Sequence, residues 1–358
     1  MVILIIGAGP AGLSHAIELS RLGHKVRIID KALEASPYSK AIVINPRTLH
    51  LLEASGATVK LLAEGIKLPS LCMHDSNGKL LVKVQLDLLK DRYPFMLALS
   101  QCITERILTE ILAGFGVQIE RGKEFIGLQQ NTHSIVAEIN TPLGIESIAA
   151  EYLIAADGAH SAVRHTLNVG FSGVAFDDHW NLADLMIDWP AGFSDSNIYM
   201  LKEGVVLLII KIAKGRFRVI TNVPNALQYL PKEAKIGEIF WQSDFKVSCR
   251  QVSDYRVGRV CLMGDAAHIH SPAGGRGMNL GIEDACVLAD LIDKGQVDRY
   301  NSMRHPVGKK VIEFTNGLFK TATLQNPWAC FLRNIVLKHI VSHKWIQRRL
   351  IKKIAGLA

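Results

Sequence analysis

Residues 258–290 read GRVCLMGDAAHIHSPAGGRGMNLGIEDACVLAD, and this stretch decides the expected fold. The short apolar run at 260–263 predicts a buried strand, and Gly264 and Asp265 stand where that strand should end. A polar, glycine-rich loop follows at 268–277. An acid and a flexible loop at the end of a buried strand are typical of a ligand site at the edge of a sheet.

A helix is expected directly after this loop. Apolar residues at helical spacing predict it over residues 280–289, with Asn279 at its start. The glycines would let the backbone approach a ligand closely, and the helix N-terminus would offer free N–H groups and partial positive charge to an anionic atom. An ordinary βα turn is the alternative, which the number of glycines in this one loop disfavours.

The first 30 residues form a second unit of this kind. An apolar run at 2–6 predicts a strand, GAGPAG occupies 7–12, and helical apolar spacing follows over 13–22. A second predicted strand at 25–29 ends in Asp30. This is a βαβ unit with GxGxxG in the position that binds a dinucleotide pyrophosphate. An acid at the place of Asp30 favours a free ribose 2′-OH, as in FAD or NAD.

The middle of the chain is mostly patterned as strands. Asn77-Gly78 predicts a hairpin within residues 66–98, and residues 170–250 alternate as β-structure does. Helices are expected over 49–53 and 101–113, and strands over 117–120, 125–129, 135–139, 182–188, 205–212 and 216–221. Four aromatic side chains here favour core packing over a substrate cage: Phe176, Trp180, Tyr199 and Trp241.

A third polar motif follows another predicted strand. Residues 152–156 are apolar, and residues 157–164 then read DGAHSAVR, with an arginine seven residues after the acid. One interpretation of this motif is a capped turn after a core strand. The other interpretation is that the motif forms part of the cofactor site. The motif alone does not choose between them.

The composition limits the class of protein. A chain of 358 residues is long enough for two domains or one large interwoven one, and no apolar run is long enough to span a bilayer. The apolar start of the chain is too short for the apolar region of a signal peptide. Six cysteines are scattered without a CxxC pair, so we expect reduced thiols in a cytoplasmic protein, with no disulfide framework and no metal site.

The net charge of +8 belongs to the end of the chain. Glu313 is the last acid, and eight of the 41 Lys and Arg residues follow it, which leaves 33 basic residues against 33 acids before that point. Nucleic-acid binding is therefore not indicated by the charge.

The C-terminal stretch has its own pattern. If residues 332–357 form a helix that begins near Asn326-Pro327, its apolar residues share about one third of the helical wheel and most cations lie opposite. One interpretation is a helical pair that packs on the body of the protein. The other is a surface helix that docks on anionic lipid, with Trp345 at the boundary. The apolar residues are Leu332, Val336, Ile340, Ile346, Leu350, Ile354 and Leu357, and the cations are Arg333, Lys338, Lys344, Arg348, Arg349 and Lys352.

With GAGPAG, DGAHSAVR and GDAAHIHSPAGGRGMN in this order, the chain resembles the FAD-dependent aromatic hydroxylases, the single-component flavoprotein monooxygenases of the para-hydroxybenzoate hydroxylase type, including polyprenyl-methoxyphenol hydroxylase-like proteins. The resemblance covers nearly the whole chain, and the third motif is the most specific. It implies a Rossmann-like α/β FAD-binding domain interwoven with a smaller, mainly antiparallel β substrate domain, plus C-terminal helices. The corresponding residues are 1–67, 99–169 and 251–300 for FAD, 68–98 and 170–250 for substrate, and 301–358 for the helical segment.

The resemblance also implies roles for residues in this sequence. The pyrophosphate would lie on residues 7–12, the adenosine ribose on Asp30, the ribityl chain on Asp265, and the isoalloxazine ring along Pro272 and the glycine loop, with the N-terminus of the following helix beneath its N1 and O2 end. The FAD-site residues implied in this way are Gly7, Ala8, Gly9, Pro10, Ala11, Gly12, Asp30, Lys31, Lys40, Arg47, Gln101 (with Glu105), Asp157, Gly158, Arg164, Gly264, Asp265, Pro272, Gly274, Gly275, Gly277, Met278 and Asn279.

Three positions depart from the family, and one of them is Lys211, near a place where the substrate-domain sheet of relatives often carries proline. Lys40 stands where many relatives have the arginine of a segment that contacts the nicotinamide cofactor, and lysine lacks the bidentate fork of arginine. Arg276 stands where glutamine is frequent. No catalytic acid or base is assigned, since the flavin carries the chemistry. His160, His268 and His270 are interpreted as hydrogen-bonding loop residues.

The implied reaction is hydride transfer from NADH or NADPH, bound transiently, to FAD, followed by O₂ addition and hydroxylation of a phenol-like or related lipophilic substrate through a C4a-hydroperoxyflavin. A flavin-dependent reductase or dehydrogenase of an isoprenoid or quinone is the first alternative. A catalytically degenerate flavin-binding protein at a membrane is the second. The expected location is cytoplasmic, with peripheral attachment to the inner face of a membrane as the further hypothesis. The identity of the phenol, the choice of nicotinamide cofactor and the oligomeric state are not indicated.

Overall fold

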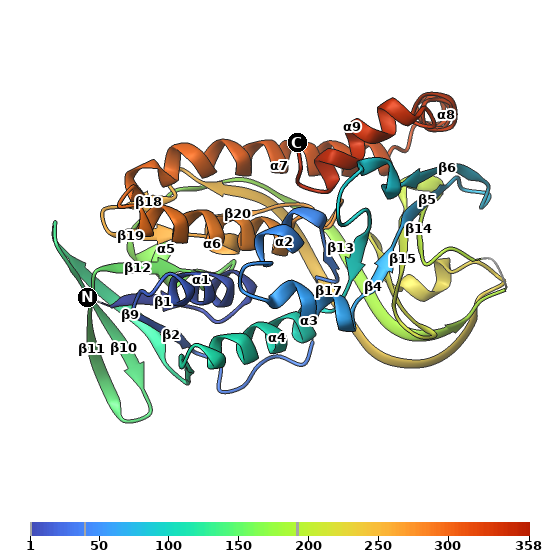
Figure 1. The fold of residues 1–358 in the computed structure, drawn as a ribbon. Helices are drawn as coiled ribbons and strands as arrows, with labels where there is room; N and C mark the ends of the chain where they lie inside the picture. The colour runs from blue at the N-terminus through green and yellow to red at the C-terminus, as the bar shows by residue number, and fades with distance from the viewer. Residues whose placement is uncertain (1, 39–40, 191–192) are drawn as a thin grey trace.

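The computed structural model describes residues 2–38, 41–190 and 193–358, which are built around two large sheets (Figure 1). Within this part of the chain, one sheet has six strands in the order β18-β19-β12-β1-β2-β8, and all neighbours are parallel except the β18–β19 pair. The parallel order confirms the Rossmann-like α/β prediction. Its strands are β1 (Ile3–Ile6), β2 (Val26–Asp30), β8 (Ile119–Arg121), β12 (Tyr152–Ala155), β18 (Arg256–Val257) and β19 (Val260–Leu262).

Helices bury the apolar residues of this sheet. Helix α1 (Pro10–Arg21) begins within GAGPAG, and α6 (Gly277–Asp293) begins directly after the second glycine loop. These two helices pack on each other, and α4 (Gln101–Gly114) packs on α1. Leu13 and Ile17 of α1 are fully buried. Burying a side chain of this size contributes about 1.5–3 kcal/mol, so the helices hold the nucleotide motif against the sheet.

The second sheet is mainly antiparallel and has the order β20-β17-β13-β16-β15-β14-β5-β6 in the described residues. Its two longest strands, β13 and β17, have 18 residues each and pair along most of their length. The Asn77-Gly78 prediction is confirmed, because β5 and β6 form an antiparallel pair around it and Gly78 has a φ of +78°. The strands are β5 (Ser70–His74), β6 (Leu80–Gln85), β13 (Phe171–Asp188), β14 (Ser196–Met200), β15 (Val206–Ala213), β16 (Arg216–Thr221), β17 (Lys235–Val252) and β20 (His268–Ile269).

Smaller elements complete the body, and several differ from the sequence prediction. No strand was predicted at β11, whereas β14 and β17 lie in the 170–250 region that was predicted as β-structure without bounds for these two strands. Helix α6 begins at Gly277 rather than at Asn279, which lies inside the helix. Helix α2 begins earlier than predicted, because Asn45 caps it by accepting a hydrogen bond from the Thr48 N–H. The elements are β3 (Val43–Ile44), β4 (Ile66–Leu68), β7 (Met96–Ala98), β9 (Glu124–Gln130), β10 (Ile135–Thr141), β11 (Gly144–Ala150), α2 (Pro46–Leu51), α3 (Ala57–Glu64), α5 (Ala162–Thr166), η1 (Leu86–Leu89), η2 (Lys202–Gly204), η3 (Ala226–Tyr229), η4 (Gly264–Ala266) and η5 (Val297–Arg299).

The C-terminal part runs as a long helix followed by shorter pieces (Figure 1). After α7 (Tyr300–Ala322) come α8 (Pro327–Ile335), the π-helical segment η6 (Val336–Ile340) and α9 (Lys344–Ile354). Asn326 caps α8 as its place before Pro327 predicts. The prediction of one helical wheel from 332 to 357 is wrong, because the chain turns between η6 and α9.

The two halves of this tail bury different faces. Helix α9 packs on β6 and η1, with Ile351 1% exposed and Ala355 fully buried against the residues of that corner. Helix α8 instead turns Arg333 inward, where the guanidinium donates to the Ala322 carbonyl at 3.0 Å. Its apolar residues therefore face outward. Over the described residues, no helix combines the length and apolar character needed to cross a membrane.

One buried histidine joins the two central helices. His15 of α1 is fully buried, and its Nδ1 lies 2.8 Å from the Ala285 carbonyl oxygen of α6. Burial lowers the pKa of His15 from 6.5 to about 4. A histidine that is neutral in the folded state but titrates normally when unfolded makes folding less favourable as the pH falls from 6.5 toward 4.

We therefore expect the free energy of unfolding to fall in this pH window, by on the order of 3 kcal/mol for His15. The variant His15→Gln retains a side-chain donor but cannot be protonated, so its stability should depend less on pH. Urea unfolding at several pH values measures this, and His133→Gln in an exposed turn is the control. Equal slopes for His15→Gln and the unmodified protein would contradict the assignment.

Candidate functional site

The GAGPAG loop has the backbone shape of a phosphate cradle. Gly7 has a φ of +102°, and a Cβ there would lie 2.3 Å from the Ala156 carbonyl oxygen. A Cβ at Gly12 would lie 2.0 Å from the Gly7 carbonyl oxygen. A Cβ at Gly9 would meet no atom of the described residues within 4 Å. The outer glycines therefore allow the strand, helix and neighbouring strand to pack, while the middle one leaves open space for a ligand.

The start of α1 and the end of β2 lie beside this cradle. Gly9 is the N-cap of α1 and has no side chain to occupy the first N–H groups of the helix. The Asp30 carboxylate accepts hydrogen bonds from the Ala8 N–H at 2.7 Å and the Ala32 N–H at 2.8 Å. The helix N-terminus thus favours an anionic group, and the carboxylate is fixed at the edge where a ribose would lie.

The DGAHSAVR motif is tied to the cradle and to the 264–266 turn. Arg164 is 3% exposed and donates to the Ala266 carbonyl at 3.1 Å and to the Ala159 carbonyl at 2.9 Å. Its guanidinium lies 4.0 Å from the Phe171 ring centre. Burial raises the pKa of Asp157, whose carboxylate accepts from the Val163 N–H at 3.2 Å and so caps the start of α5. The motif thus caps a turn after a core strand and also borders the cavity, through Gly158, Ala159, His160 and Arg164.

A buried ionic cluster holds the turn that carries Asp265. Asp284 of α6 accepts from the Gly264 N–H at 3.3 Å, lies 2.6 Å from His268 Nε2, and accepts from Arg304 Nε at 2.6 Å. Burial alone would raise the pKa of Asp284, but the Arg304 guanidinium and His268 outweigh it and hold the pKa below its usual value. The carboxylate thus stays ionised and connects the strand end, the loop and α7.

The glycine loop of 270–277 rests on Asn279. The Asn279 side chain donates to the carbonyls of Val43 at 2.8 Å and Gly275 at 2.7 Å, and accepts from the Asn45 N–H at 2.9 Å. Asn279 is 2% exposed and faces protein backbone. Asn279 was expected beneath a flavin ring, but its side chain supports the backbone of the loop instead. Gly277 and Met278 line the cavity.

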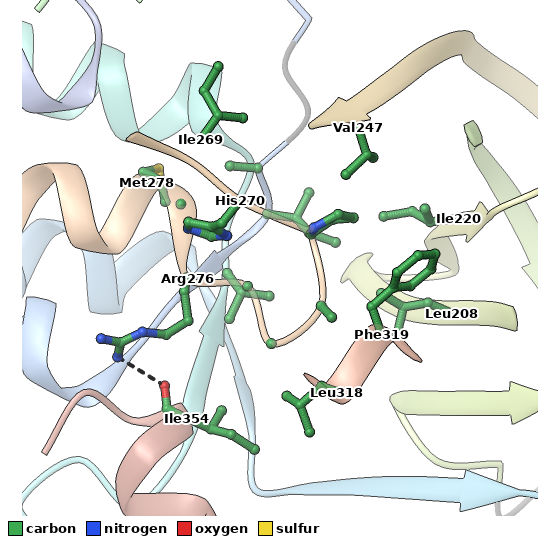
Figure 2. Close-up of a pocket in the computed structure, with 18 of the residues that line it drawn as sticks. Leu208, Ile220, Val247, Ile269, His270, Arg276, Met278, Leu318, Phe319 and Ile354 are labelled. Atoms are coloured by element: carbon green, nitrogen blue, oxygen red, sulfur yellow. Dashed lines mark hydrogen bonds between the residues drawn. The ribbon is translucent and has the colours of Figure 1, made fainter. Parts of the chain in front are cut away.

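Arg276 and His270 place two more buried polar groups in this loop. Burial lowers the pKa of the Arg276 guanidinium, which donates to the Ile354 carbonyl of α9 at 3.4 Å (Figure 2). Burial also lowers the pKa of His270 to about 4, and its Nδ1 lies 2.8 Å from the Ser271 carbonyl oxygen. His270 is therefore neutral at pH 7. His160, the remaining histidine of the motifs, is exposed at the cavity rim.

All these loops border one cavity of about 1500 Å³ that extends from the cradle into the second sheet. Figure 2 shows its inner part, with His270 and Met278 on the loop side and Leu208, Ile220 and Val247 on the sheet side. The sheet side is lined mostly by apolar and aromatic side chains, with Ser70, Ser196, Lys246, Ser248 and Arg250 as polar members. The apolar ones include Leu71, Met73, Trp180, Ile198, Met200, Leu208, Ile210, Ile220 and Phe245, and α7 adds Phe319.

The expected site residues divide into three groups. Those that line the cavity are Gly9, Pro10, Ala11, Gln101, Gly158, Arg164, Gly264, Asp265, Pro272, Gly274, Gly275, Gly277 and Met278. Those that shape or flank it without lining it are Gly7, Ala8, Gly12, Asp30, Lys31, Arg47, Asp157 and Asn279. Lys40 lies outside the described residues.

Sequence reasoning missed most of the apolar lining. Of the four aromatic residues that were expected in the core, Trp180 is 5% exposed and packs near Phe245 and Phe319, yet it also borders the cavity. Tyr199 is in the core of the sheet, as expected, and Trp241 stacks on Tyr38 at 5.2 Å between ring centres. Phe176 lies among the residues whose side chains are not described. No motif marked the lining residues, and strand alternation was the only available signal.

The residues present fit FAD. The open space at Gly9, the uncapped start of α1 and the oriented Asp30 suit a dinucleotide. Two buried polar atoms at the cavity, His270 Nε2 and Arg164 Nε, make no hydrogen bond to any residue in the described part of the chain. A bound ligand could supply their hydrogen-bond partners. An adenine dinucleotide in the cradle and a flavin ring along the glycine loop would use both ends of this site.

The fold and the cradle thus define a flavoprotein of the FAD-dependent aromatic hydroxylase class. The family described as "FAD binding domain" matches residues 1–209 and 218–315. The chain belongs to this family of FAD-dependent aromatic hydroxylases.

Individual relatives agree with this assignment. The chain is 31% identical to 6-methylpretetramide 4-monooxygenase of Streptomyces rimosus, over 99% of this chain and 68% of the relative. It is 30% identical to pentachlorophenol 4-monooxygenase of Sphingobium chlorophenolicum, over 88% of this chain and 64% of the relative. The chain thus spans about two thirds of the length of these curated relatives.

Solved structures show the same fold. The p-nitrophenol 4-monooxygenase of Pseudomonas putida DLL-E4 superimposes with a TM-score of 0.88 at 22% identity, covering 99% of this chain and 97% of that one. The anhydrotetracycline hydroxylase of Streptomyces rimosus gives a TM-score of 0.82 at 26% identity, covering 100% of this chain and 76% of that one.

Asp265 tests the cofactor site. Replacing it in Asp265→Ala should remove hydrogen bonds to the ribityl chain of FAD and weaken FAD binding by about 1–3 kcal/mol. The measurement is the flavin-to-protein absorbance ratio after purification, followed by FAD titration of the apoprotein. Asp290→Ala on the exposed side of α6 is the matched control. Full FAD retention by Asp265→Ala would remove this residue from the site.

Proposed function

We propose that the protein is a single-component monooxygenase that hydroxylates a phenol-like ring. The net reaction is Ar–H + O₂ + NAD(P)H + H⁺ → Ar–OH + H₂O + NAD(P)⁺, in which the nicotinamide supplies two electrons and one oxygen atom enters the ring. The observation that carries the proposal is one cavity that joins an FAD cradle to an apolar, aromatic-lined chamber. Two relatives act on pentachlorophenol and on p-nitrophenol, which are phenols.

FAD, when bound, supplies both the hydride acceptor and the oxygen-activating centre. The chain supplies position and environment. The cradle at Gly9 would hold the pyrophosphate, Asp265 the ribityl chain, and the N-terminus of α6 would stabilise negative charge at the nearby end of the ring. His270, which is neutral at pH 7, is a hydrogen-bonding group next to the chamber.

The chamber would orient the substrate ring and exclude water. Its lining side chains offer apolar contact from three directions: the sheet at Leu208, the loop at Pro272 and α7 at Phe319. Removing water from such a site protects a reactive oxygen species from unproductive decay. A polar substrate group would find few charged partners on the sheet side, so we expect a substrate that is largely apolar.

Measuring O₂ consumption and the incorporation of oxygen into the product distinguishes this function from the alternatives. The FAD-loaded protein, supplied with NADH or NADPH and a panel of phenols, should consume O₂ and incorporate one atom of isotopically labelled O₂ into the product. An aromatic ligand should also accelerate reduction of the bound flavin. Turnover without O₂ uptake would favour a reductase of an isoprenoid or quinone. Absence of flavin reduction by either nicotinamide would favour a flavin-binding protein without this catalysis.

We further propose that α8 attaches the protein peripherally to anionic lipid. Its outward stripe recurs at helical spacing and consists of Trp328, Phe331, Leu332 and Ile335, which are 76%, 57%, 59% and 39% exposed. The inward position is held by Arg333. A helix that buries a cation and exposes aromatic residues is poorly suited to water and well suited to a lipid interface.

The positive charge of the C-terminal segment around α8 favours anionic lipid as the binding partner. Eight Lys and Arg residues and no acid lie between residues 314 and 358. Cations near an anionic membrane contribute roughly 1 kcal/mol each, so several together support reversible attachment. This surface of apolar and basic residues on α8, η6 and the outer side of α9 is called the docking surface below.

Vesicle co-sedimentation tests the docking surface. The protein should pellet with vesicles of phosphatidylglycerol and phosphatidylcholine at low salt, less at high salt, and hardly with pure phosphatidylcholine. The triple variant Trp328→Ser, Phe331→Ser, Leu332→Ser should bind much more weakly. Truncating the tail is a poorer test, because α9 fills part of the core.

The matched control changes three apolar residues elsewhere that are on the whole more exposed: Leu33→Ser, Leu143→Ser and Ile145→Ser. Light scattering of both variants reports the oligomeric state. Vesicle binding that is independent of lipid charge and salt, or unchanged in the α8 variant, contradicts lipid docking. A dimer that the α8 variant alone dissociates would show instead that this face binds a second copy.

A further inference from the structure

The cavity reaches the protein surface between α7 and the C-terminal tail. On this side of the cavity, four lining residues are exposed to solvent: Glu313, Gly317 and Thr321 of α7, and Val336 of η6. Tyr38, His160, Lys246 and Asp265 are exposed elsewhere on its lining. Val336 is 42% exposed. A residue that lies on both the cavity wall and the surface marks a rim, so these four residues define an opening, called here the tail mouth.

The walls inside the tail mouth are apolar. The cavity lining here includes Phe314 and Leu318 of α7 and, from the C-terminal tail, Leu337, Val341 and Leu350. Figure 2 shows Leu318 below the loop of His270, and Phe319 beside Leu208. An apolar molecule that enters past Glu313 and Thr321 of the rim would meet these apolar side chains before the chamber, where a flavin ring would lie along the glycine loop.

The tail mouth and the docking surface meet at consecutive residues of the chain. Ile335 ends the outward stripe of α8, and the next residue, Val336, is part of the rim. Lys353, on the far side of the rim, lies 5.8 Å from the Phe314 ring centre. The docking surface therefore adjoins the opening on its tail side, while α7 contributes the rest of the rim, including the carboxylate of Glu313.

The far wall of the mouth is also fixed to the cofactor side of the cavity. Arg276 donates to the Ile354 carbonyl, and the Arg47 N–H donates to the Ala355 carbonyl at 3.1 Å. A Cβ at Gly356 would lie 2.5 Å from Arg276 Nη1, so this junction is closely packed. The tail is thus a built wall of the cavity and not an appendage beside it.

We propose that the tail mouth admits the substrate from the lipid, and that the substrate is a phenol-type ring with a long apolar substituent. The inference rests on the proposed function, since it names the substrate class and route for that same site. The ring would enter first, and the substituent would remain along the apolar walls and in the lipid. Each methylene favours such surroundings over water by roughly fourfold, so transfer through water would be slow for a long substituent.

Gly317 offers a clean test, because it lies on the rim in α7 and a Cβ there meets nothing within 4 Å. The variant Gly317→Trp places a large side chain in the mouth, and Gly317→Ala leaves it open. The matched control is Gly114→Trp, also a helical glycine with no atom within 4 Å of its Cβ, at the end of α4 and away from the cavity. Val336→Trp obstructs the same rim from the tail.

The probes are phenol and 4-nonylphenol, titrated without lipid and without nicotinamide into the FAD-loaded protein while the flavin absorbance spectrum is recorded. The unmodified protein should bind 4-nonylphenol at least about tenfold more tightly than phenol. Gly317→Trp and Val336→Trp should weaken 4-nonylphenol binding at least about tenfold and phenol binding no more than about twofold. Gly317→Ala and Gly114→Trp should match the unmodified protein, and FAD content reports folding in every case.

This readout is independent of turnover and of vesicle binding, so its failure is distinct from theirs. Equal affinity for both phenols would overturn the substrate class. Unchanged binding of 4-nonylphenol in both obstructed variants, with FAD retained, would overturn the route. A further arm delivers 4-nonylphenol in anionic or in neutral vesicles. Faster spectral change with anionic vesicles supports uptake from lipid, and equal rates would show entry from water.

Discussion

The structure depends most on one buried carboxylate. Asp284 sits on α6 and is 1% exposed, yet it remains ionised because Arg304 and His268 bond to it from two sides. Through the Gly264 N–H it also holds the end of β19. Removing one partner from a buried ion pair commonly costs 3–5 kcal/mol, since the remaining charge has no water. The turn with Asp265, the glycine loop and α7 therefore share a single anchor, and the cofactor side of the cavity is rigid for that reason.

The opposite side of the cavity is set by packing alone. Strands β13 and β17 pair along most of their length near one edge of the second sheet, where β20 pairs with β17. Their length carries apolar residues such as Trp180 and Val247 over the cavity. The cofactor side of the cavity, called the floor below, is polar and hydrogen-bonded and is specific for a cofactor. The sheet side, called the roof below, is apolar and is specific mainly for the shape of a ligand. Substrate range in such an arrangement varies through the roof while the floor stays the same.

The sequence predicts the floor well and the roof poorly, for a physical reason. GAGPAG and the 264–279 stretch act through local backbone geometry, such as the positive φ of Gly7, and local geometry can be read from spacing. The lining of the roof comes from strands far apart in the chain, and alternation indicates which residues point together but not what lies opposite. The tail shows the same limit. Its apolar spacing predicts helices correctly, but the turn before α9 and the inward Arg333 decide which face meets the body.

The order of the strands in the parallel sheet has a consequence for biosynthesis. β1 lies between β2, which follows it closely in the chain, and β12, which begins at residue 152, and β19 is added only after residue 259. A ribosome that has released the first βαβ unit has released the nucleotide motif but neither the neighbour that packs on Gly7 nor the helix that covers α1. Pairings over such separations form late. The cradle and the glycine loop therefore come together as one site only after α6 has been synthesised, when most of the chain has emerged.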